Sequence, residues 1–331
     1  MKKLLKWLLG LAVLAIVAVG GVVGYGYYAF TGQGPLSADK VVYIPKGASL
    51  DTIADTLAKD GVIESPLIFK IGVRAYGTHN RLRAGEYSFP ARVSARGAME
   101  VLVSGKPILH RFAVPEGWTT WQILEKLRET PRLVGKITLK PREGTLLPNT
   151  YFFARGDSRD DIVRRMQAAL RKTLNEAWAQ RLPDLPLKSK QEVLILASIV
   201  EKETGKPEER SRVAGVFVNR LRRGMKLETD PTVIYGLTDG KGALGRRLLR
   251  RDLRNEHPYN TYVHEGLPPG PIANPGRAAI MAAVRPMKHK EIYFVADGTG
   301  GHAFAETYAE HRRNVAKWRR VRRELERKGE R

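Results

Sequence analysis

An uncharged apolar stretch near the N-terminus constrains what this chain can fold into more than any other feature. It runs from Trp7 to Phe30 and follows a short segment with lysines at positions 2, 3 and 6. An apolar helix of about 20 residues is long enough to cross a bilayer, so we expect a transmembrane anchor over residues 7–30. The lysines would remain cytoplasmic, and the tyrosines at positions 25, 27 and 28 suit the opposite headgroup interface.

A cleavable signal peptide is the alternative interpretation of this stretch. The apolar run is long for a signal peptide, and no clear small-x-small cleavage site ends it. We therefore favour a retained anchor. The sequence predicts a single-pass protein of the cell inner membrane, with residues 1–6 in the cytoplasm and the remainder in the periplasm.

The charge balance narrows the class of partner. Lys and Arg number 57 against 34 Asp and Glu, which gives a formal net charge of +23. Such a balance favours an anionic partner. Nucleic acid is an improbable one, because most of the chain would lie outside the cytoplasmic membrane. The anionic partners that remain are membrane lipid and polymers that carry carboxylates. The chain has no cysteine, which excludes disulfides, thiol nucleophiles and cysteine-ligated zinc.

A duplication follows a polar segment, residues 31–40, that we expect to be a linker. The sequence IPKGASLDTIADTL at 44–57 recurs as VPEGWTTWQILEKL at 114–127. Each copy predicts a strand, a Pro/Gly turn and a helix, with Ser49 or Thr119 as the N-cap. Helical spacing places apolar side chains on one face at positions 50, 53, 54 and 57, and at 118, 121, 123, 124 and 127. Each copy could be a binding module or a structural spacer.

The rest of the chain predicts an α+β fold, with a boundary near Gly144 between the duplicated region, 41–143, and a C-terminal domain, 144–331. A capping box at Ser189 and Glu192 begins the helix of greatest interest. Other segments have strand-like, helical or turn character. We expect strands within 81–89, 108–114 and 143–153, helices at 159–179 and 207–223, N-caps at Asp230 and Asn274, a hairpin at 292–304, and a basic C-terminal helix.

Two glutamates end the apolar helix that carries SIVEKET at 198–204. At 100° per residue, Glu201 and Glu203 point to nearly opposite faces, so at most one addresses a given cleft. A carboxyl held against apolar side chains keeps its neutral form, as a general acid at neutral pH requires. The alternative is that both glutamates are simply exposed to solvent at the helix end, where they pair with Lys202, Lys206 or Arg210.

The sequence lacks the motifs of metal enzymes, serine hydrolases and nucleotide-binding enzymes. The seven histidines show no close metal-ligand spacing, and neither a G-x-S-x-G elbow nor a P-loop is present. We expect no metal and no cofactor. Residues 259–262 (YNTY) alternate aromatic faces with hydrogen-bonding groups, a mixture suited to sugar rings, although a strand with a polar outer face is an alternative. The loop GLPPGPIANPG at 266–276 could form the wall of a groove or only a turn.

Together these motifs resemble one family, the endolytic murein transglycosylases of the MltG (YceG-like) type. The resemblance rests on LASIVEKET at 196–204, VFVNRLRRGMKLETDPTVIYG at 216–236, YNTY, GLPPGPIANPG, and YFVADGTGGHAF at 293–304. It extends to the anchor and to LysM-like modules in the duplicated region. It implies that Glu201 is the catalytic acid/base. We expect substrate-binding residues within the same motifs, namely Asn219, Arg220, Thr229, Asp230, Tyr235, Tyr259, Asn260, Thr261, Tyr262, Pro268 and Pro269.

The resemblance implies cleavage of the MurNAc–GlcNAc β-1,4 bond of nascent peptidoglycan, leaving 1,6-anhydro-MurNAc ends. The expected partners are glycan strands, inner-membrane lipid, penicillin-binding proteins and other wall-synthesis proteins. One well-placed carboxylate suffices when the sugar's own C6 hydroxyl is the nucleophile. Two alternatives remain, a non-catalytic glycan-binding anchor and a hydrolytic muramidase with Asp230 or Glu228 as a second carboxylate.

Overall fold

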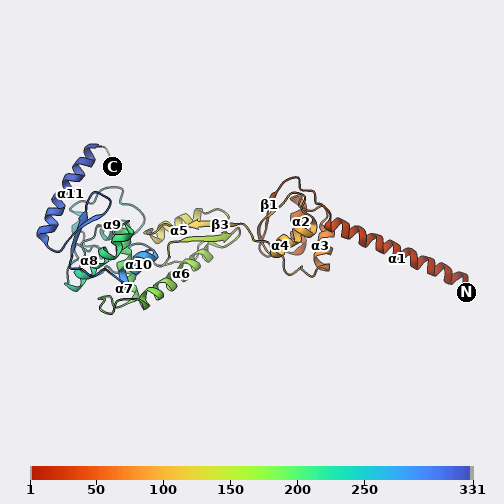
Figure 1. Ribbon diagram of the computed structural model, residues 1–331, viewed down its shortest axis with the longest axis horizontal. Helices are drawn as coiled ribbons and strands as arrows, with labels where there is room; N and C mark the ends of the chain where they lie inside the picture. Colours follow the sequence, from red (N-terminus) through yellow and green to blue (C-terminus); the bar gives the residue numbers. More distant parts are fainter. Residues whose placement is uncertain (1, 329–331) are drawn as a thin grey trace. The chain divides into compact units, whose positions relative to one another are not determined.

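The computed structural model describes residues 2–328 and has a mixed α+β fold, as predicted (Figure 1). Its contacts divide the chain into two compact units. The first comprises residues 1–111 with 132–134 and 152–157, and the second comprises 112–131, 135–151 and 158–331. The second copy of the duplication thus falls within the second unit. The domain limits inferred from the sequence remain a prediction.

The first unit contains a helical layer over a two-stranded sheet. Strands β1 and β2 pair antiparallel, with Lys40 opposite Phe89 and Ile44 opposite Gly85. Ser49 caps α2 through the backbone N–H of Thr52, as predicted. The elements of this unit are α1 (Lys2–Thr31), β1 (Lys40–Ile44), α2 (Leu50–Lys59), α3 (Pro66–Ala75), β2 (Gly85–Phe89) and α4 (Ala95–Ser104).

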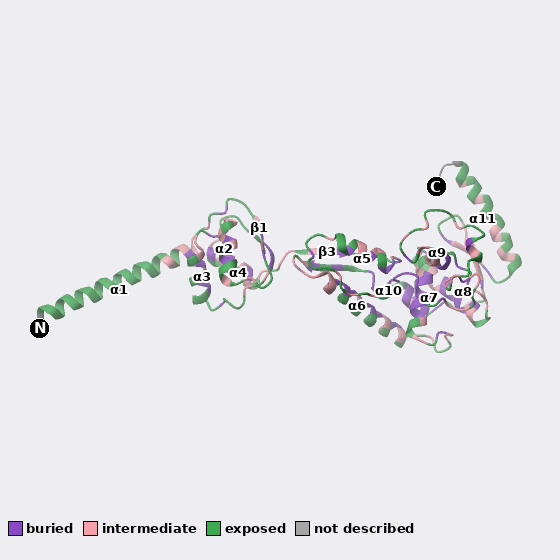
Figure 2. Cartoon of the chain, turned by 180° about the vertical axis from the view of Figure 1, so that it is seen from behind, coloured by how far each residue is buried: buried purple, intermediate pink, exposed green. Residues whose placement is uncertain are grey.

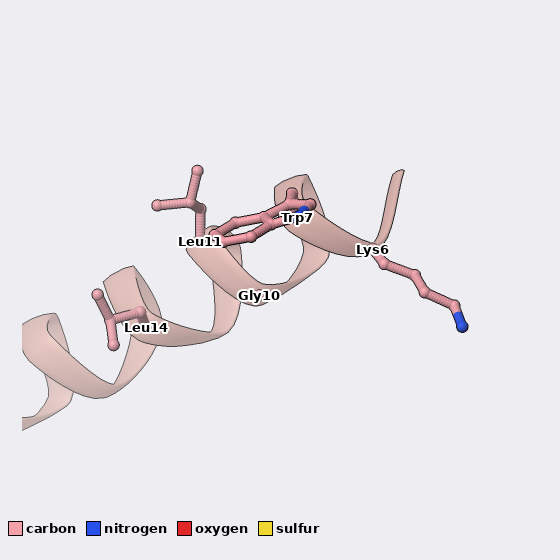
Figure 3. A pocket seen from close by; sticks show the side chains of 5 residues that line it. All are labelled: Lys6, Trp7, Gly10, Leu11 and Leu14. Carbon is pink, nitrogen blue, oxygen red and sulfur yellow. The ribbon is translucent and has the colours of Figure 1, made fainter. Parts of the chain in front are cut away.

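Helix α1 is exposed along almost its whole length, as Figure 2 shows. By length and composition it could cross a membrane, a test that a signal sequence near the N-terminus also passes. Figure 3 shows Trp7, Leu11 and Leu14 projecting from the helix around Gly10, with Lys6 extending away from them. The hollow between these side chains is the bare surface of a single apolar helix, not an enclosed site.

The last turn of α1 is part of the folded unit. Phe30 is 3% exposed and belongs to the same apolar cluster as Phe69 and Val73 of α3. The segment predicted as a linker is also packed, because Leu36 is buried and its carbonyl accepts the N–H of Arg92 at 2.8 Å. The exposed apolar surface of α1 therefore ends before Phe30.

The second unit is mainly helical. Its core is built around α7, whose side chains from Val193 to Val200 are all buried (Figure 2). Helices α8 and α10 pack against α7. The elements are α5 (Thr120–Glu129), α6 (Arg159–Ala179), α7 (Lys190–Glu203), η1 (Pro207–Glu209), α8 (Arg210–Arg222), α9 (Asp230–Thr238), η2 (Asp252–Arg254), α10 (Arg277–Val284), β5 (Tyr293–Ala296), β6 (His302–Ala305) and α11 (Tyr308–Lys328).

Several predicted segments of this unit are confirmed. The hairpin of β5 and β6 pairs antiparallel, and the carboxylate of Asp297 in its turn accepts the backbone N–H groups of Thr299 and Gly301. Strands β3 (Leu109–Ala113) and β4 (Thr150–Ala154) form a further two-stranded sheet, and the division between the two units passes through both strands. Residues 259–262 lie in turns, so the strand considered for YNTY is wrong.

The helix caps follow the prediction in part. Thr119 and Gln122 form a complete capping box on α5. At α7, Ser189 accepts the N–H of Glu192, but the carboxylate of Glu192 accepts the N–H of Lys188 instead of completing the box. The N-caps predicted at Asp230 and Asn274 are wrong. The N-cap of α9 is Thr229 and that of α10 is Gly276, because the side chains of Asp230 and Asn274 are engaged in tertiary hydrogen bonds.

The apolar face predicted for the second repeat also needs correction. In α2 three of the four expected positions are buried, Ile53, Ala54 and Leu57, and the fourth, Leu50, is half-buried. In α5 they are Thr120, Ile123 and Leu127, whereas Trp118 is half-buried and Trp121 is 43% exposed. Spacing alone placed both indoles in the core, because it does not distinguish the buried side of a short helix from its margin.

Candidate active site

The end of helix α7 places Glu201 at the edge of the core. The side chain of Glu201 is only 4% exposed. Glu203, two residues later, contacts a different set of residues, as the helical rotation of 100° per residue predicts. The two glutamates therefore belong to two separate polar clusters.

Glu201 is held by one backbone donor and one cation. The N–H of Gly276 donates to its Oε2 at 2.8 Å, and the guanidinium of Arg210 lies 3.4 Å from its Oε1. The same Arg210 nitrogen lies 3.2 Å from the carboxylate of Glu116. Arg210 thus bridges two carboxylates, and pairing of Glu201 with Arg210, foreseen as an alternative role, does occur.

The surroundings of Glu201 raise its pKa. Burial is the largest cause, and the negative charge of Glu116 acts in the same direction. The Gly276 N–H and Arg210 lower the pKa by smaller amounts. The carboxyl is therefore biased toward its protonated form, and two donors are already in place to receive the anion when the proton leaves. That combination suits a group that acts as an acid and then as a base.

Two glycines lie against the carboxylates of this site. A Cβ on Gly276 would overlap the carboxylate of Glu116. Gly117 has a φ of +75°, a left-handed conformation that favours glycine, and a Cβ there would lie 3.6 Å from Cγ of Glu201. The turn of the second repeat, at 115–118, is thus brought against the end of α7.

Hydrogen bonds of Asn274 hold the loop before Gly276 against the turn at 115–118. Its backbone N–H donates to the carbonyl of Trp118 at 2.9 Å, and its own carbonyl accepts the N–H of Gly117 at 3.1 Å. Its side-chain amide donates to Trp118 and to Glu143, and its Oδ1 accepts the N–H of Leu146 at 2.8 Å. Asn274 is fully buried, so these bonds fix the position of the loop.

Glu143 is a second buried carboxyl in this network. It accepts the N–H of Thr120 at 2.8 Å and that of Gly144 at 3.1 Å. Burial is the main cause of its raised pKa. The hydroxyl of Tyr235 lies 3.5 Å from its other oxygen, and the rings of Tyr235 and Tyr259 are 4.8 Å apart. Glu143 therefore connects the Asn274 network to two of the predicted binding tyrosines.

Glu203 is the centre of the other cluster. The hydroxyl of Thr229 donates to its carboxylate. Nearby, the hydroxyl of Tyr262 donates to Asp230 at 2.6 Å. Burial, assisted by the charge of Asp230, raises the pKa of Glu203 to about 7, against the opposing effects of Thr229 and His302. Three predicted binding residues, Thr229, Asp230 and Tyr262, thus gather near Glu203 and not at the carboxylate of Glu201.

Most of the other predicted binding residues make hydrogen bonds to other parts of the fold. Asn260 is buried and donates to the carbonyls of Leu253 and Asn255, and the buried Thr261 accepts the N–H of Thr229. Asn219 donates to the carbonyls of His289 and Glu291, and Arg220 donates to that of Ile292. Pro268 is buried and Pro269 is exposed. A binding role for any of these residues remains a prediction.

Sequence reasoning did not single out Glu116, Glu143 or Gly276 as parts of the site. One signal was available for Glu116, because the equivalent position of the first repeat carries the opposite charge, at Lys46. Glu143 and Gly276 lie in loops whose contacts depend on the tertiary fold. Within residues 2–328, no group of three or more histidine, aspartate or glutamate side chains is placed to bind a metal.

Comparison with known proteins agrees with the resemblance. A model of the YceG-like family matches residues 42–317. A Streptococcus pneumoniae (strain D39) protein named endolytic murein transglycosylase is 30% identical over 92% of this chain and 64% of its own length. A Bacillus subtilis (strain 168) protein of the same name is 32% identical over 84% of each chain.

The chain thus spans somewhat less than two thirds of the Streptococcus relative. A crystal structure of a yceG-like protein from Listeria monocytogenes is 30% identical and matches 83% of this chain and 98% of that one, with a TM-score of 0.49. The family match covers most of the chain and includes the residues around Glu201. The chain belongs to the YceG-like family.

Proposed function

We propose that this protein is a membrane-anchored endolytic lytic transglycosylase of peptidoglycan, with Glu201 as its acid/base. The observation that carries the proposal is a buried carboxyl of raised pKa that is already bonded to the Gly276 N–H and to Arg210. The names of the two relatives supply the substrate class. The reaction is cleavage of the MurNAc–GlcNAc β-1,4 bond within nascent strands, which terminates or releases them.

The proposed reaction uses one carboxyl twice. Protonated Glu201 gives its proton to the glycosidic oxygen while the bond between that oxygen and C1 of the MurNAc ring breaks. The C6 hydroxyl of the same ring attacks C1, and Glu201, now a carboxylate, accepts the hydroxyl proton. A 1,6-anhydro ring and a free 4-hydroxyl result, and Glu201 returns to its protonated form. The attacking group is tethered, so the reaction gains the advantage of an intramolecular step.

The partners of Glu201 have separate effects on this cycle. Burial favours the protonated form of the carboxyl before reaction, and the Gly276 N–H and Arg210 stabilise the anion between the two transfers. Burial of Arg210, which is 13% exposed, strengthens its electrostatic effect on the neighbouring carboxylate. Glu116 moderates that effect by sharing the guanidinium.

A hydrolytic muramidase is the second candidate, and one observation favours it. The pKa of Glu203 is raised to about 7, in part by the negative charge of Asp230, so two carboxyls lie within electrostatic reach of each other in that cluster. In such an enzyme one carboxyl protonates the leaving oxygen and the other activates water or attacks C1. The products would have reducing ends instead of anhydro ends.

The N-terminal half has a proposed role in location. Helix α1 anchors the chain in the inner membrane as a single span with a cytoplasmic N-terminus, and the two units lie in the periplasm near nascent glycan. The duplicated region acts as LysM-like modules that bind the strand. The net charge of +23 suits anionic lipid and the carboxylates of stem peptides. Penicillin-binding proteins and other wall-synthesis proteins are the proposed partners.

One experiment tests the proposed function against both rivals. The full chain in detergent micelles is incubated with uncrosslinked peptidoglycan, and the new glycan ends are identified by mass spectrometry. Anhydro-MurNAc ends support the transglycosylase, and reducing MurNAc ends support the muramidase. An unchanged glycan that nevertheless co-sediments with the protein supports the non-catalytic anchor.

A further inference from the structure

A shallow hollow on helix α5 combines two indole rings with polar side chains. Trp121 is 43% exposed, and Trp118 is half-buried with the ammonium of Lys126 5.1 Å from its ring centre. The residues that line the hollow are Trp118, Trp121, Gln122, Glu125, Lys126 and Glu129. An exposed tryptophan beside hydrogen-bonding groups presents an apolar face and polar partners together, as a sugar ring requires.

The duplication shows that the repeat does not need these indoles for its fold. Trp118 and Trp121 correspond to Ala48 and Asp51 of the first copy. The first copy nevertheless forms the same strand, turn and capped helix, with Ser49 in the position of Thr119. The two tryptophans are therefore particular to the second copy, and they remain outside its buried set.

The first residue of the hollow, Trp118, directly follows a residue that lies against the candidate catalytic carboxyl. Gly117, immediately before Trp118, packs against Glu201, where a Cβ would lie 3.6 Å from Cγ of the glutamate. The carbonyl of Trp118 accepts bonds of 2.9 and 3.0 Å from the backbone and side chain of Asn274. Asn274 precedes Gly276, the residue whose N–H holds Glu201, by two positions. A short hydrogen-bonded path thus fixes Trp118 relative to Glu201.

We propose that Trp118 and Trp121 form a saccharide subsite that binds rings of the glycan strand on one side of the bond to be cleaved. The inference rests on the proposed function and deepens it, because it assigns a place for the strand beyond the reacting sugars. The exposed indole of Trp121 stacks on a sugar ring, and the amide NH₂ of Gln122, whose oxygen is held in the capping box, contacts ring substituents. Trp118, with Lys126 over its ring, forms the side of the subsite. A ring bound there is aligned by the same backbone that carries Gly117 against Glu201.

Binding is measured apart from cleavage. Glycan strands freed of stem peptides are titrated by calorimetry into the full chain in detergent micelles, in a Glu201→Gln background that prevents turnover. We expect Trp121→Asp, the first copy's residue, to weaken binding about tenfold, the size of one lost stacking contact of ~1.4 kcal/mol. The double variant with Trp118→Ala weakens it further. Trp121→Phe retains most of the affinity.

Tyr308→Ala is the matched control, because Tyr308 is an exposed aromatic residue of the same unit, on α11. In the otherwise native chain, Trp121→Asp should raise KM and leave kcat nearly unchanged. Native affinity and native KM in the Trp118→Ala, Trp121→Asp double variant would overturn the subsite while leaving the proposed function intact. An equal loss in Tyr308→Ala would also overturn it. If the native chain fails to cleave, the proposed function fails, and the titration still decides whether the hollow binds glycan.

Discussion

The backbone N–H of Gly276 donates a 2.8 Å hydrogen bond to Oε2 of Glu201. This bond joins the N-cap of α10 to the last turn of α7, two elements that also pack together in the core. It directs one oxygen of a nearly buried carboxyl and stabilises its charged form, against a pKa raised by burial. The position of the candidate acid therefore depends on a loop about 75 residues further along the chain.

Substitution of Gly276 by alanine should impair cleavage by a local effect. The added Cβ would overlap the side chain of Glu116 from its Cγ to its carboxylate, so Glu116 must turn away, and its contact with Arg210, the cation beside Glu201, is disturbed. Since a small displacement of a catalytic group has a large effect on rate, we expect kcat to fall about tenfold or more. Turnover of uncrosslinked peptidoglycan measures this change.

Gly205→Ala is the control for that substitution. Gly205 follows the same motif, and a Cβ there meets nothing within 4 Å among the described residues. It should retain native turnover and thermal stability. A Gly276→Ala variant with native kcat would show that this close approach does not matter for the reaction.

Arg210 and Glu116 should shift the pH dependence of cleavage in opposite directions. Arg210 lowers the pKa of Glu201, and Glu116 raises it. If protonated Glu201 is the acid, activity falls as the pH rises through its pKa. The alkaline limb of the kcat/KM profile should therefore move to higher pH in Arg210→Met and to lower pH in Glu116→Gln.

Arg222→Met is the control for these profiles, because it also removes a cation from the same helix. Arg222 is more exposed than Arg210 and is paired with Asp184. Its alkaline limb should coincide with that of the native chain. Shifts of the same sign in Arg210→Met and Glu116→Gln would contradict the assignment of Glu201 as the titrating acid.

Glu203 should make the fold less stable as the pH rises. Its pKa is raised from 4.5 to about 7 in the folded state, so the folded protein binds the proton more tightly than the unfolded chain does. This contribution is complete below pH 4.5 and is lost between pH 4.5 and 7. Glu203→Gln should remove about 1–3 kcal/mol of that pH dependence.

Thermal unfolding of the full chain in micelles at pH 4, 6 and 8 measures the effect. We expect the native chain to lose stability relative to Glu203→Gln between the first and the last pH. The conservative change Glu192→Gln, in the first turn of the same helix and away from the Glu203 cluster, should leave the profile unchanged. Parallel profiles for the native chain and Glu203→Gln would place the proton of Glu203 outside this range.

The anchor can be removed without damage to the first unit if the deletion ends at the right place. Phe30 is buried in the apolar cluster of that unit, so a deletion of residues 1–28 retains it. This form should be soluble without detergent, whereas the full chain should sediment with membranes. A deletion of residues 1–31 removes Phe30 and should unfold at a lower temperature. Sedimentation of both shortened forms with membranes would show that other surfaces hold the protein there.

The sequence predicted those features that depend on local pattern. The α+β class, the long apolar helix, the helix that ends in Glu201 and the hairpin around Asp297 all follow from periodicity and turn residues, and the structure confirms them. The N-caps predicted at Asp230 and Asn274 are wrong, because both side chains make hydrogen bonds elsewhere in the fold. Asp230 accepts the hydroxyl of Tyr262, and Asn274 accepts the backbone N–H of Leu146.

The candidate site was harder to predict than the fold. Glu201 stands out because it ends a buried helix, but its partners come from residues 116, 210 and 276, which only the tertiary structure brings together. The separation of Glu201 from Glu203 followed from helix geometry. The distribution of the binding residues did not, since Thr229, Asp230 and Tyr262 gather near Glu203.

The most direct test compares Glu201→Gln with Glu203→Gln in the full chain, using mass spectrometry of the glycan ends released from uncrosslinked peptidoglycan. Both changes remove a proton-transfer group and keep the shape of the side chain. With Glu201 as acid/base, the native chain and Glu203→Gln produce 1,6-anhydro-MurNAc ends, and Glu201→Gln produces none although it still binds glycan. Anhydro ends from Glu201→Gln together with an inactive Glu203→Gln would contradict the account.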